Sequence, residues 1–472
     1  MLFNSFVYMF LFLPAVLWVY FAANRRGWGH AAVGFLGLAS LFYYGWWNPA
    51  YLSLIVGSMV VNYFVGRLLS SPFLARPKRY ALLVAGVAAN LALLGFYKYA
   101  DFFSTNVNAV LGTGIPMLNL ALPLGISFFT FQQVAYLVDA WRGEVIETGP
   151  VRYCLFVSYF PQLIAGPIVH HAEMMPQFAD PRLRKLDWDN VAAGLHRFAL
   201  GAFKKAVVAD TCGLIANTGY DAALKLSTPE AWVTTFAYTL QLYFDFSGYT
   251  DMAIGSARMF NIEIPENFNA PYKAVDIQDF WRRWHMTLSR FLRSYLYVPL
   301  GGNRTGEARL YFNLFVTFLL GGLWHGAGWT FVAWGAMHGA GVVLHRAWKR
   351  YSKVSLPRVA GWALTLLFVH VAWVFFRAPD LQSAINLLGC MAGGAEAVGF
   401  SNFASVGRLD LALAACIMIP AGIAAASGPT VQELSARFRP EWRRVAISAV
   451  LLVVAILYIN STIPKEFLYY DF

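Results

Sequence analysis

The chain has 472 residues, of which 58% are hydrophobic and 13% are charged, and its mean hydropathy is +0.51. Soluble domains carry roughly 25% charged residues, so this composition excludes an ordinary soluble protein and indicates an all-α polytopic membrane protein. The formal net charge of +11 comes from basic clusters between apolar runs. This positive-inside pattern favours contact with anionic lipid headgroups and argues against nucleic-acid binding.

The sequence shows neither a paired cysteine pattern nor a separate hydrophilic domain. Its four cysteines are scattered in mostly apolar surroundings, so we expect no disulfide framework and no zinc site. The adjacent His170 and His171 point apart on a helix, which argues against a metal site there. Residues 1–472 are expected to form one membrane-embedded unit. Because Arg25 and Arg26 follow the first apolar run, we expect that run to be retained as a span.

Apolar runs from end to end predict the membrane spans. With basic loops on the cytoplasmic side, both termini lie outside, and a short external tail begins at Asn460. No internal repeat is evident, which argues against an inverted-repeat transporter. The first four spans are ordinary apolar segments and are interpreted as scaffold. The predicted spans are about 6–23, 31–47, 51–69, 80–97, 118–138, 151–169, 192–218, 231–256, 312–322, 326–345, 359–376, 409–427 and 445–460, each near the length that a bilayer requires or shorter.

Proline and glycine interrupt two segments, residues 123–132 (PLGISFFTFQ) and 160–168 (FPQLIAGPI). Irregular backbone at membrane depth is tolerated only where it is buried in protein or lines a cavity. The polar side chains of the first segment either line a pore or join helices by hydrogen bonds. Shortly after it, Asp139 and Arg142 are predicted to form an ion pair.

Two carboxylates, Asp245 and Asp251, lie in the aromatic span at 231–256. Buried carboxylates need hydrogen bonds or protonation. Their spacing places them on different faces of a helix, so we expect them to do different jobs, either fixing neighbouring helices or taking part in chemistry. His370, in an aliphatic span, is interpreted as a core histidine with hydrogen-bond partners.

Residues 261–310 form the longest amphipathic region, in which cations alternate with aromatic residues. This pattern predicts an interfacial or re-entrant layer on the cytoplasmic side. Most of its arginines, taken singly, would anchor lipid headgroups. His285 differs, because it lies where the layer turns apolar.

In residues 321–329 (GGLWHGAGW), His325 lies among glycines and tryptophans. An ionisable residue at membrane depth is a functional candidate, and glycines allow backbone or a ligand to come close. The apolar leg at 312–322 holds eleven residues, about 16 Å of helix against roughly 30 Å of hydrocarbon, so His325 is predicted to lie at a turn deep in the membrane. Water-free surroundings favour a neutral imidazole, which can act as a base. The alternative is a structural histidine bonded to a carbonyl at a helix contact.

Taken together and in order, seven segments resemble the membrane-bound O-acyltransferase (MBOAT) family, and within it the bacterial subgroup of alginate O-acetyltransferases. The resemblance covers essentially the whole chain. It implies a ring of transmembrane helices, with re-entrant and interfacial helices, around a central tunnel reached from both sides of the membrane. It also implies functional histidines in the Trp-His-Gly and Arg-Trp-His pieces, which are His325 and His285. The segments are 5–7, 123–132, 160–168, 245–252, 267–272, 280–285 and 324–328.

The resemblance implies an inner-membrane O-acetyltransferase of exopolysaccharide modification, with alginate as the expected polymer. Acetyl-CoA is the expected donor, and its phosphates suit Arg282, Arg283 and Arg290. His325 would act as general base or transient acyl carrier, and His285 would orient a substrate or share the proton transfer. The acetyl group would pass to a periplasmic acceptor or partner, such as an SGNH-type acetyltransferase or a polysaccharide assembly protein. No metal is implied.

Three alternatives remain open at this point. A family member acting on cellulose, peptidoglycan or teichoic acid (by D-alanylation) would be distinguished by its neighbouring genes. A transporter would move a substrate without covalent chemistry, and a scaffold would only recruit the periplasmic enzyme. Both of these predict that a His325→Ala variant keeps polymer acetylation, whereas the acyltransferase hypothesis predicts its loss.

Overall fold

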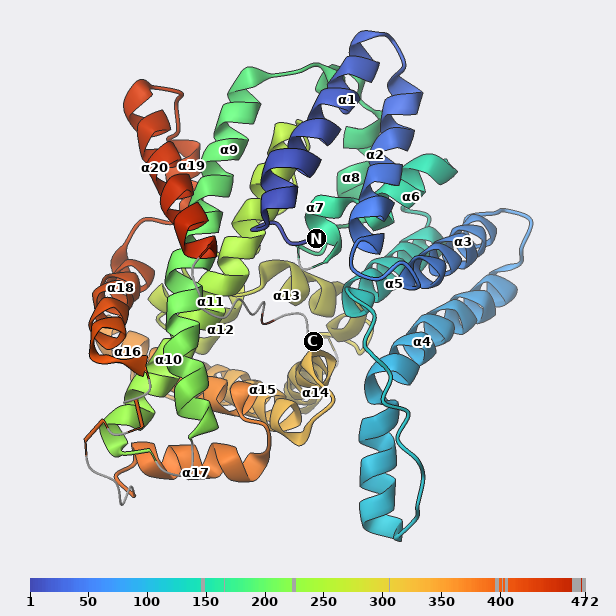
Figure 1. Ribbon diagram of the computed structural model, residues 1–472. Helices are drawn as coiled ribbons and strands as arrows, with labels where there is room; N and C mark the ends of the chain where they lie inside the picture. Colours follow the sequence, from blue (N-terminus) through green and yellow to red (C-terminus); the bar gives the residue numbers. More distant parts are fainter. Residues whose placement is uncertain are drawn as a thin grey trace.

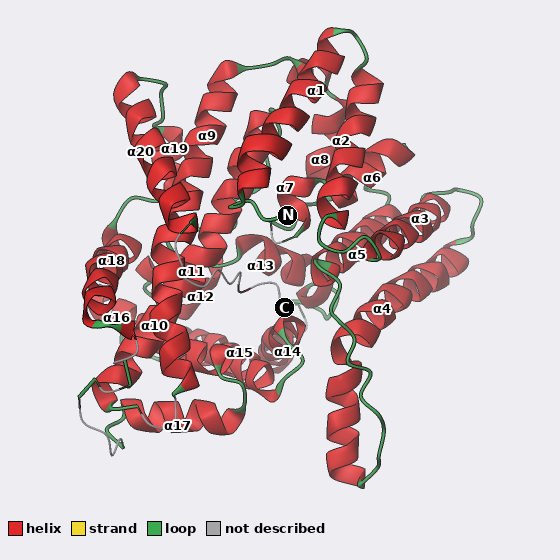
Figure 2. Cartoon of the chain, viewed as in Figure 1, coloured by secondary structure: helices red, strands yellow, loops and turns green. Residues whose placement is uncertain are grey.

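The computed structural model describes a helical chain, with no strand in the residues that it describes (Figures 1 and 2). The expected all-α polytopic class is confirmed. Five helices in this part are long and apolar enough to cross a membrane: Val7–Arg25, Tyr51–Ser70, Arg76–Leu111, Arg358–Arg377 and Trp442–Ile459. The structure describes residues 1–145, 149–164, 166–222, 226–304, 306–394, 399–400, 402–403, 406–460 and 468.

The N-terminal part of the chain is a series of long helices. One of them, α4, projects from the rest of the molecule together with the chain that leads on to α5 (Figure 1). The predicted span at 118–138 begins too early, because helix α5 starts only after Pro123 and the left-handed Gly125 (φ 70°), where helix geometry is broken. The helices are α1 (Leu13–Arg25), α2 (Gly29–Gly45), α3 (Tyr51–Leu69), α4 (Arg76–Leu111) and α5 (Ile126–Arg142).

The middle of the chain contains both short and long helices. The segment predicted at 151–169 is indeed interrupted, since Tyr159 leaves the helical conformation between α6 and α7. A π-helical turn at 204–209 joins α9 to α10, so this predicted span is one continuous helical rod. The helices are α6 (Pro150–Ser158), α7 (Phe160–Leu163), α8 (His171–Ala179), α9 (Trp188–Phe203), α10 (Asp210–Asp221) and α11 (Thr228–Met259).

Helices α9 and α11 cross at glycines, in the buried centre of the protein. A Cβ atom at Gly194 would lie 2.6 Å from the carbonyl oxygen of Gly255, and one at Gly201 would lie 2.6 Å from that of Gly248. Small residues let membrane helices approach this closely. The close crossing brings the cations of α9 within reach of the carboxylates of α11.

The buried carboxylates of α11 have separate cationic partners, although they do the same kind of job and not the different ones that their spacing suggested. Asp251 pairs with Arg197 at 2.9 Å and with Lys204 at 2.7 Å, whereas Asp245 pairs with Lys205 at 2.7 Å. Buried charges of opposite sign offset one another's desolvation when they are paired in this way. Both carboxylates therefore fix neighbouring helices.

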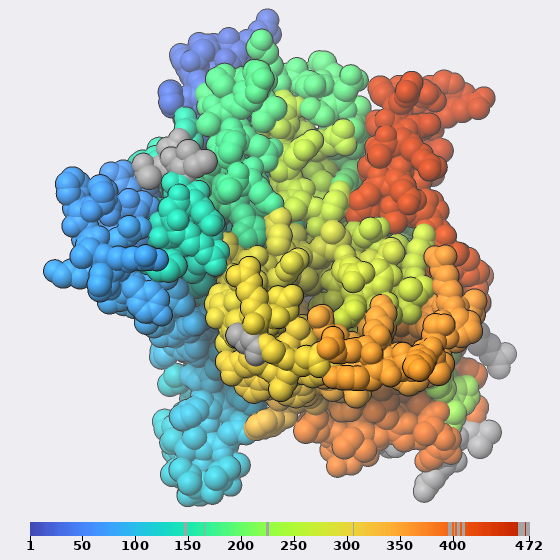
Figure 3. Space-filling model, turned by 180° about the vertical axis from the view of Figure 1, so that it is seen from behind, coloured from blue at the N-terminus to red at the C-terminus, as the bar shows by residue number. Residues whose placement is uncertain are grey.

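The remaining helices build the part of the molecule around His325. Segments of this part, coloured yellow to orange, lie in the middle of the face seen in Figure 3. The predicted short leg at 312–322 is wrong: α14 is 19 residues long, about 28 Å, because it begins in the polar residues before the apolar run. The predicted tail after Asn460 lies almost wholly outside the described residues. The helices are α12 (Ile277–Arg283), α13 (Met286–Leu292), α14 (Glu307–His325), α15 (Trp329–Tyr351), α16 (Arg358–Arg377), α17 (Leu381–Met391), α18 (Arg408–Ser427), α19 (Val431–Ala436) and α20 (Trp442–Ile459).

Candidate functional site

Helices α14 and α15 form a hairpin whose turn directly follows His325. The two helices lie close together, because a Cβ atom at Gly322 would lie 2.7 Å from the Cα atom of Gly335. α14 ends at His325, and the extended backbone of Gly326 (φ −161°) carries the chain away from the helix. The prediction that His325 lies at a turn is confirmed.

The imidazole of His325 is buried among aromatic rings, and the residue is only 2% exposed. Its ring centroid lies 4.9 Å from Trp324, 5.1 Å from Trp334 and 5.2 Å from Phe376. These rings meet the imidazole edge to face, so they restrict its orientation without supplying a counter-charge.

His285 lies beside His325, and their ring centroids are 6.4 Å apart. The residue is fully buried and precedes α13 with a left-handed backbone (φ 42°). Such a backbone is uncommon for a residue other than glycine and costs of order 1–3 kcal/mol. The surrounding contacts must hold it, and one of them is the hydrogen bond from the N–H of Met286 to the carbonyl of Asn267 (2.9 Å).

Asn267 also fixes which nitrogen of His285 carries the hydrogen. Its side-chain oxygen accepts from the hydroxyl of Thr287 (2.9 Å) and from the N–H of Thr287 (3.3 Å), and it lies 3.0 Å from Nδ1 of His285. Because an amide oxygen only accepts, Nδ1 carries the hydrogen and Nε2 of the neutral ring keeps its lone pair. Within the described residues this Nε2 has no hydrogen-bond partner. A buried basic nitrogen beside a second imidazole is suited to proton transfer.

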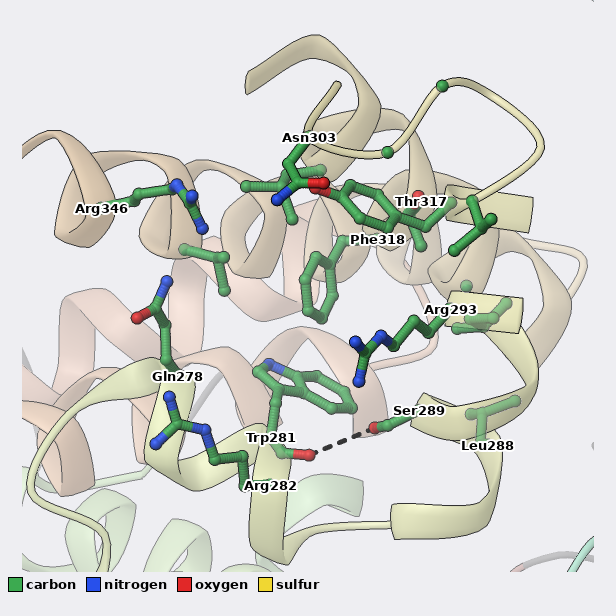
Figure 4. A pocket seen from close by; sticks show the side chains of 18 of the residues that line it. Gln278, Trp281, Arg282, Leu288, Ser289, Arg293, Asn303, Thr317, Phe318 and Arg346 are labelled. Atoms are coloured by element: carbon green, nitrogen blue, oxygen red, sulfur yellow. Dashed lines mark hydrogen bonds between the residues drawn. The ribbon is translucent and has the colours of Figure 1, made fainter. Parts of the chain in front are cut away.

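A cavity of about 830 Å³ reaches His325 from the side of α12 and α13. Figure 4 shows Arg282, Arg293 and Arg346 around its interior, with Trp281 between them. Arg304 lines it as well, and no carboxylate does so in the described part of the chain. Four guanidinium groups without a lining carboxylate suit a ligand with several negative charges, above all phosphates.

The three arginines predicted to bind the donor do not lie together. Arg282 lines the cavity, whereas Arg283 and Arg290 are not among its lining residues. Arg283 donates to Asp279 (3.0 Å) and Arg290 pairs with Glu173. The roles assigned to these three arginines stay predictions.

Sequence reasoning gave no donor role to Arg293, Arg304 or Arg346, although each stands in a basic cluster next to the apolar runs. It also gave no role to Asn267, which it recorded only as part of a motif. The basic clusters beside the apolar runs were the feature of the sequence that could have indicated a donor role for these arginines. For Asn267 the signal was the motif alone, because its contact with His285 depends on the folded chain.

A second cavity, of about 330 Å³, lies against the other side of the turn after His325. It is bounded by α4, the chain at 118–122 and Phe331 of α15, and its lining includes Lys98 and Asp101. Gly326 and Ala327 line this second cavity, while His325 lines the first. The two cavities therefore approach each other at the turn that carries the histidine.

Other predicted residues are structural. His370 lies 3.1 Å from the hydroxyl of Thr235 and 2.8 Å from that of Thr239, which confirms a core histidine with partners. Asp139 and Arg142 form the predicted ion pair at 3.8 Å. No group of three metal-ligating side chains occurs among the residues that the structure describes.

Fold and site together define a polytopic membrane protein with two neighbouring buried histidines, of which His325 lines one cavity and directly precedes the turn that lines a second. A sequence model of the membrane-bound O-acyltransferase (MBOAT) family matches residues 126–385. The chain belongs to this family, and it is an acyltransferase.

Curated relatives of the chain differ in the polymer named for them. A peptidoglycan O-acetyltransferase of Helicobacter pylori is 48% identical over 424 residues, covering 83% of this chain and 80% of its own. A probable alginate O-acetylase AlgI of Pseudomonas aeruginosa is 40% identical over 399 residues, covering 83% of this chain and 75% of its own. A teichoic acid D-alanyltransferase of Bacillus subtilis is 29% identical over 252 residues, covering 50% of this chain and 62% of its own.

Proposed function

We propose that this acyltransferase is an inner-membrane O-acetyltransferase that moves acetyl groups from acetyl-CoA in the cytoplasm to a polysaccharide outside the membrane. The observation that supports this most directly is the position of His325, which lines one cavity while its neighbours Gly326 and Ala327 line another. On this proposal, the donor approaches His325 through the first cavity and the acceptor approaches the turn beside it through the second.

The donor would occupy the larger cavity, which is lined by Arg282, Arg293, Arg304 and Arg346. The positive-inside pattern of the chain supports a cytoplasmic opening for this cavity. Acetyl-CoA carries phosphates for the guanidinium groups and an acetyl thioester at the opposite end. With the phosphates at the arginines, the thioester points along the cavity toward His325.

In the reaction, the acceptor hydroxyl oxygen attacks the thioester carbonyl, the C–O bond forms and the C–S bond breaks. His325 takes the hydroxyl proton as general base and passes it to the departing thiolate of CoA. In the alternative route, a nitrogen of His325 attacks the thioester and CoA leaves as the thiol; the acceptor hydroxyl then attacks the acyl-imidazole, and its proton returns to the released imidazole. His285 is held in one tautomer by Asn267 and shares the proton transfer through Nε2. No step requires a metal.

For the acceptor, sequence identity favours peptidoglycan over the alginate that the motifs first suggested, because the peptidoglycan relative is 48% identical and the alginate relative 40%. The acetyl group would reach the polymer through a periplasmic partner of the SGNH type or a polysaccharide assembly protein, or directly.

Acetyl quantification tests the function and the acceptor together. Acetate released by mild base would be measured from purified peptidoglycan and from exopolysaccharide, in strains with the native protein or the His325→Ala variant at matched membrane levels. Loss of acetate from peptidoglycan alone supports the proposal. Loss from exopolysaccharide alone makes alginate or a similar polymer the acceptor, and unchanged acetate in both fractions contradicts an acetyltransferase dependent on His325.

A further inference from the structure

The end of α14 that carries His325 is held by side chains of α4, a helix more than two hundred residues earlier in the chain. Lys98 Nζ donates to the carbonyl of Trp324 (2.6 Å) and to that of His325 (3.1 Å). The hydroxyl of Tyr99 donates to the carbonyl of Leu323 (2.6 Å). The last three carbonyls of α14 thus receive hydrogen bonds from two consecutive residues of α4.

Electrostatics favours Lys98 at this place. The C-terminal end of a helix carries about half a negative charge, and a cation there is stabilising, most of all where water is partly excluded. The ammonium group also lies 5.8 Å from the ring centroid of Trp324 and 3.4 Å from the hydroxyl of Ser127. The hydrogen bonds of the ammonium group therefore go chiefly to the helix end that carries His325.

The position of Lys98 links it to the acyl-transfer site without placing it in the donor cavity. Lys98 lines the smaller cavity with Gly326 and Ala327, whereas His325 lines the larger one. A lysine in a scaffold helix would ordinarily direct its head to water. Here it reaches the backbone of the turn between the two cavities.

We propose that Lys98 is a positioning residue for His325: it holds the last turn of α14 so that the imidazole stays at the junction of the two cavities. The proposal rests on the acetyl-transfer function proposed above. A misplacement of about 1 Å at a reacting group can cost roughly 10²-fold in rate, so losing this anchor acts on the chemical step more than on donor binding.

The test compares Lys98→Met, which keeps the length and removes the charge and the donors, with Lys98→Arg, which keeps both. Full-length protein in lipid nanodiscs would be supplied with acetyl-CoA as donor and chitopentaose as hydroxyl acceptor, and CoA release would be measured. We expect K98M to lower kcat about 10²-fold with the KM for acetyl-CoA unchanged within about twofold. We expect the kcat of K98R to be at least about tenfold higher than that of K98M, because a positioning role needs the charge and the donors that arginine keeps. Tyr99→Phe is the matched control, and it has the smaller effect because it removes one neutral hydrogen bond.

A kcat of K98M within about threefold of the native value would overturn the proposal, as would a raised KM for chitopentaose with kcat unchanged, which would make Lys98 an acceptor-binding residue. Lys98→Gln serves as a second variant. If neither K98M nor K98Q inserts and purifies as a single species, Lys98 is needed for folding and the proposal is also overturned.

Amide hydrogen exchange separates this inference from the proposed function. We expect K98M to raise the exchange of the peptide that covers residues 321–329, while peptides from the first half of α14 keep native rates. If the native protein releases no CoA with chitopentaose, direct transfer to a sugar hydroxyl fails, whereas the exchange result still decides whether Lys98 holds the helix end. Equal exchange in K98M and the native protein contradicts the inference even if activity is present.

Discussion

Two regions of this protein bury polar and charged groups, and they differ in whether those groups are paired within the protein. At the crossing of α9 and α11, Arg197 lies between Asp251 and Glu266, and every contact is a direct ion pair. Around the turn after α14, His285 keeps an Nε2 without a partner in the described residues, and arginines line an open cavity. Buried groups that are fully paired hold helices together, whereas groups left with spare bonding capacity are the candidates for binding a substrate.

The largest expected effect comes from breaking the paired region. Arg197→Met leaves the buried carboxylate of Asp251 with Lys204 as its only ion-pair partner in the part of the chain that the structure describes. Removing one partner of a buried pair costs about 3–5 kcal/mol. We therefore expect a much lower yield of folded protein and a markedly lower melting temperature in detergent.

The matched control for this loss is Arg182→Met, which breaks the exposed pair with Asp180. This variant should have the same melting temperature as the native protein, because exposed ion pairs contribute little to the free energy of unfolding. Equal melting temperatures for R197M and R182M would contradict a structural role for the α9–α11 charges.

The next effect concerns the tautomer of His285. Asn267→Ala frees Nδ1 of His285 from the acceptor that fixes it, so we expect kcat for CoA release to fall about 10²-fold while the KM for acetyl-CoA is unchanged. Because both residues act in one step, the double variant with His285→Ala should be no slower than His285→Ala alone. Additive losses would mean that Asn267 acts independently of His285.

The smallest effect concerns the cavity arginines. Arg346→Gln removes one charge-assisted contact, worth about 1.5–3 kcal/mol, and should raise the KM for acetyl-CoA about tenfold or more with kcat nearly native. Arg283→Gln is the matched variant, since Arg283 pairs with Asp279 and does not line the cavity. We expect its KM to stay within about twofold. An equal rise in R283Q would instead support the donor contact that the sequence suggested for Arg283.

The sequence predicted the helical membrane class and the turn at His325 because both depend on local pattern. Apolar runs predict helices wherever they lie, and glycines flanking His325 weaken the helix at that point. The predicted length of the leg at 312–322 was wrong, because α14 already begins at Glu307 and includes Arg309, in residues that hydropathy assigns to a loop.

The contacts that complete the site could not be predicted from the sequence, because they join distant parts of the chain. Lys98 meets the carbonyl of His325 across 227 positions, and it stands at the end of a span interpreted as scaffold. The arginines of residues 282–293 stand in one basic, aromatic-rich segment, yet Arg282 lines the cavity while Arg290 pairs with Glu173. Which arginine faces the cavity depends on the partners that folding brings to each.

The most direct test of the central claim is single-turnover CoA release by purified full-length protein and its His325→Ala variant, with acetyl-CoA and chitopentaose. The variant must first match the native protein in yield and melting temperature. The account predicts a fall of at least about 10³-fold with acetyl-CoA still bound, because the donor cavity keeps its arginines. CoA release at a near-native rate by folded His325→Ala would contradict the account, because the acyl transfer would then not depend on the imidazole between the two cavities.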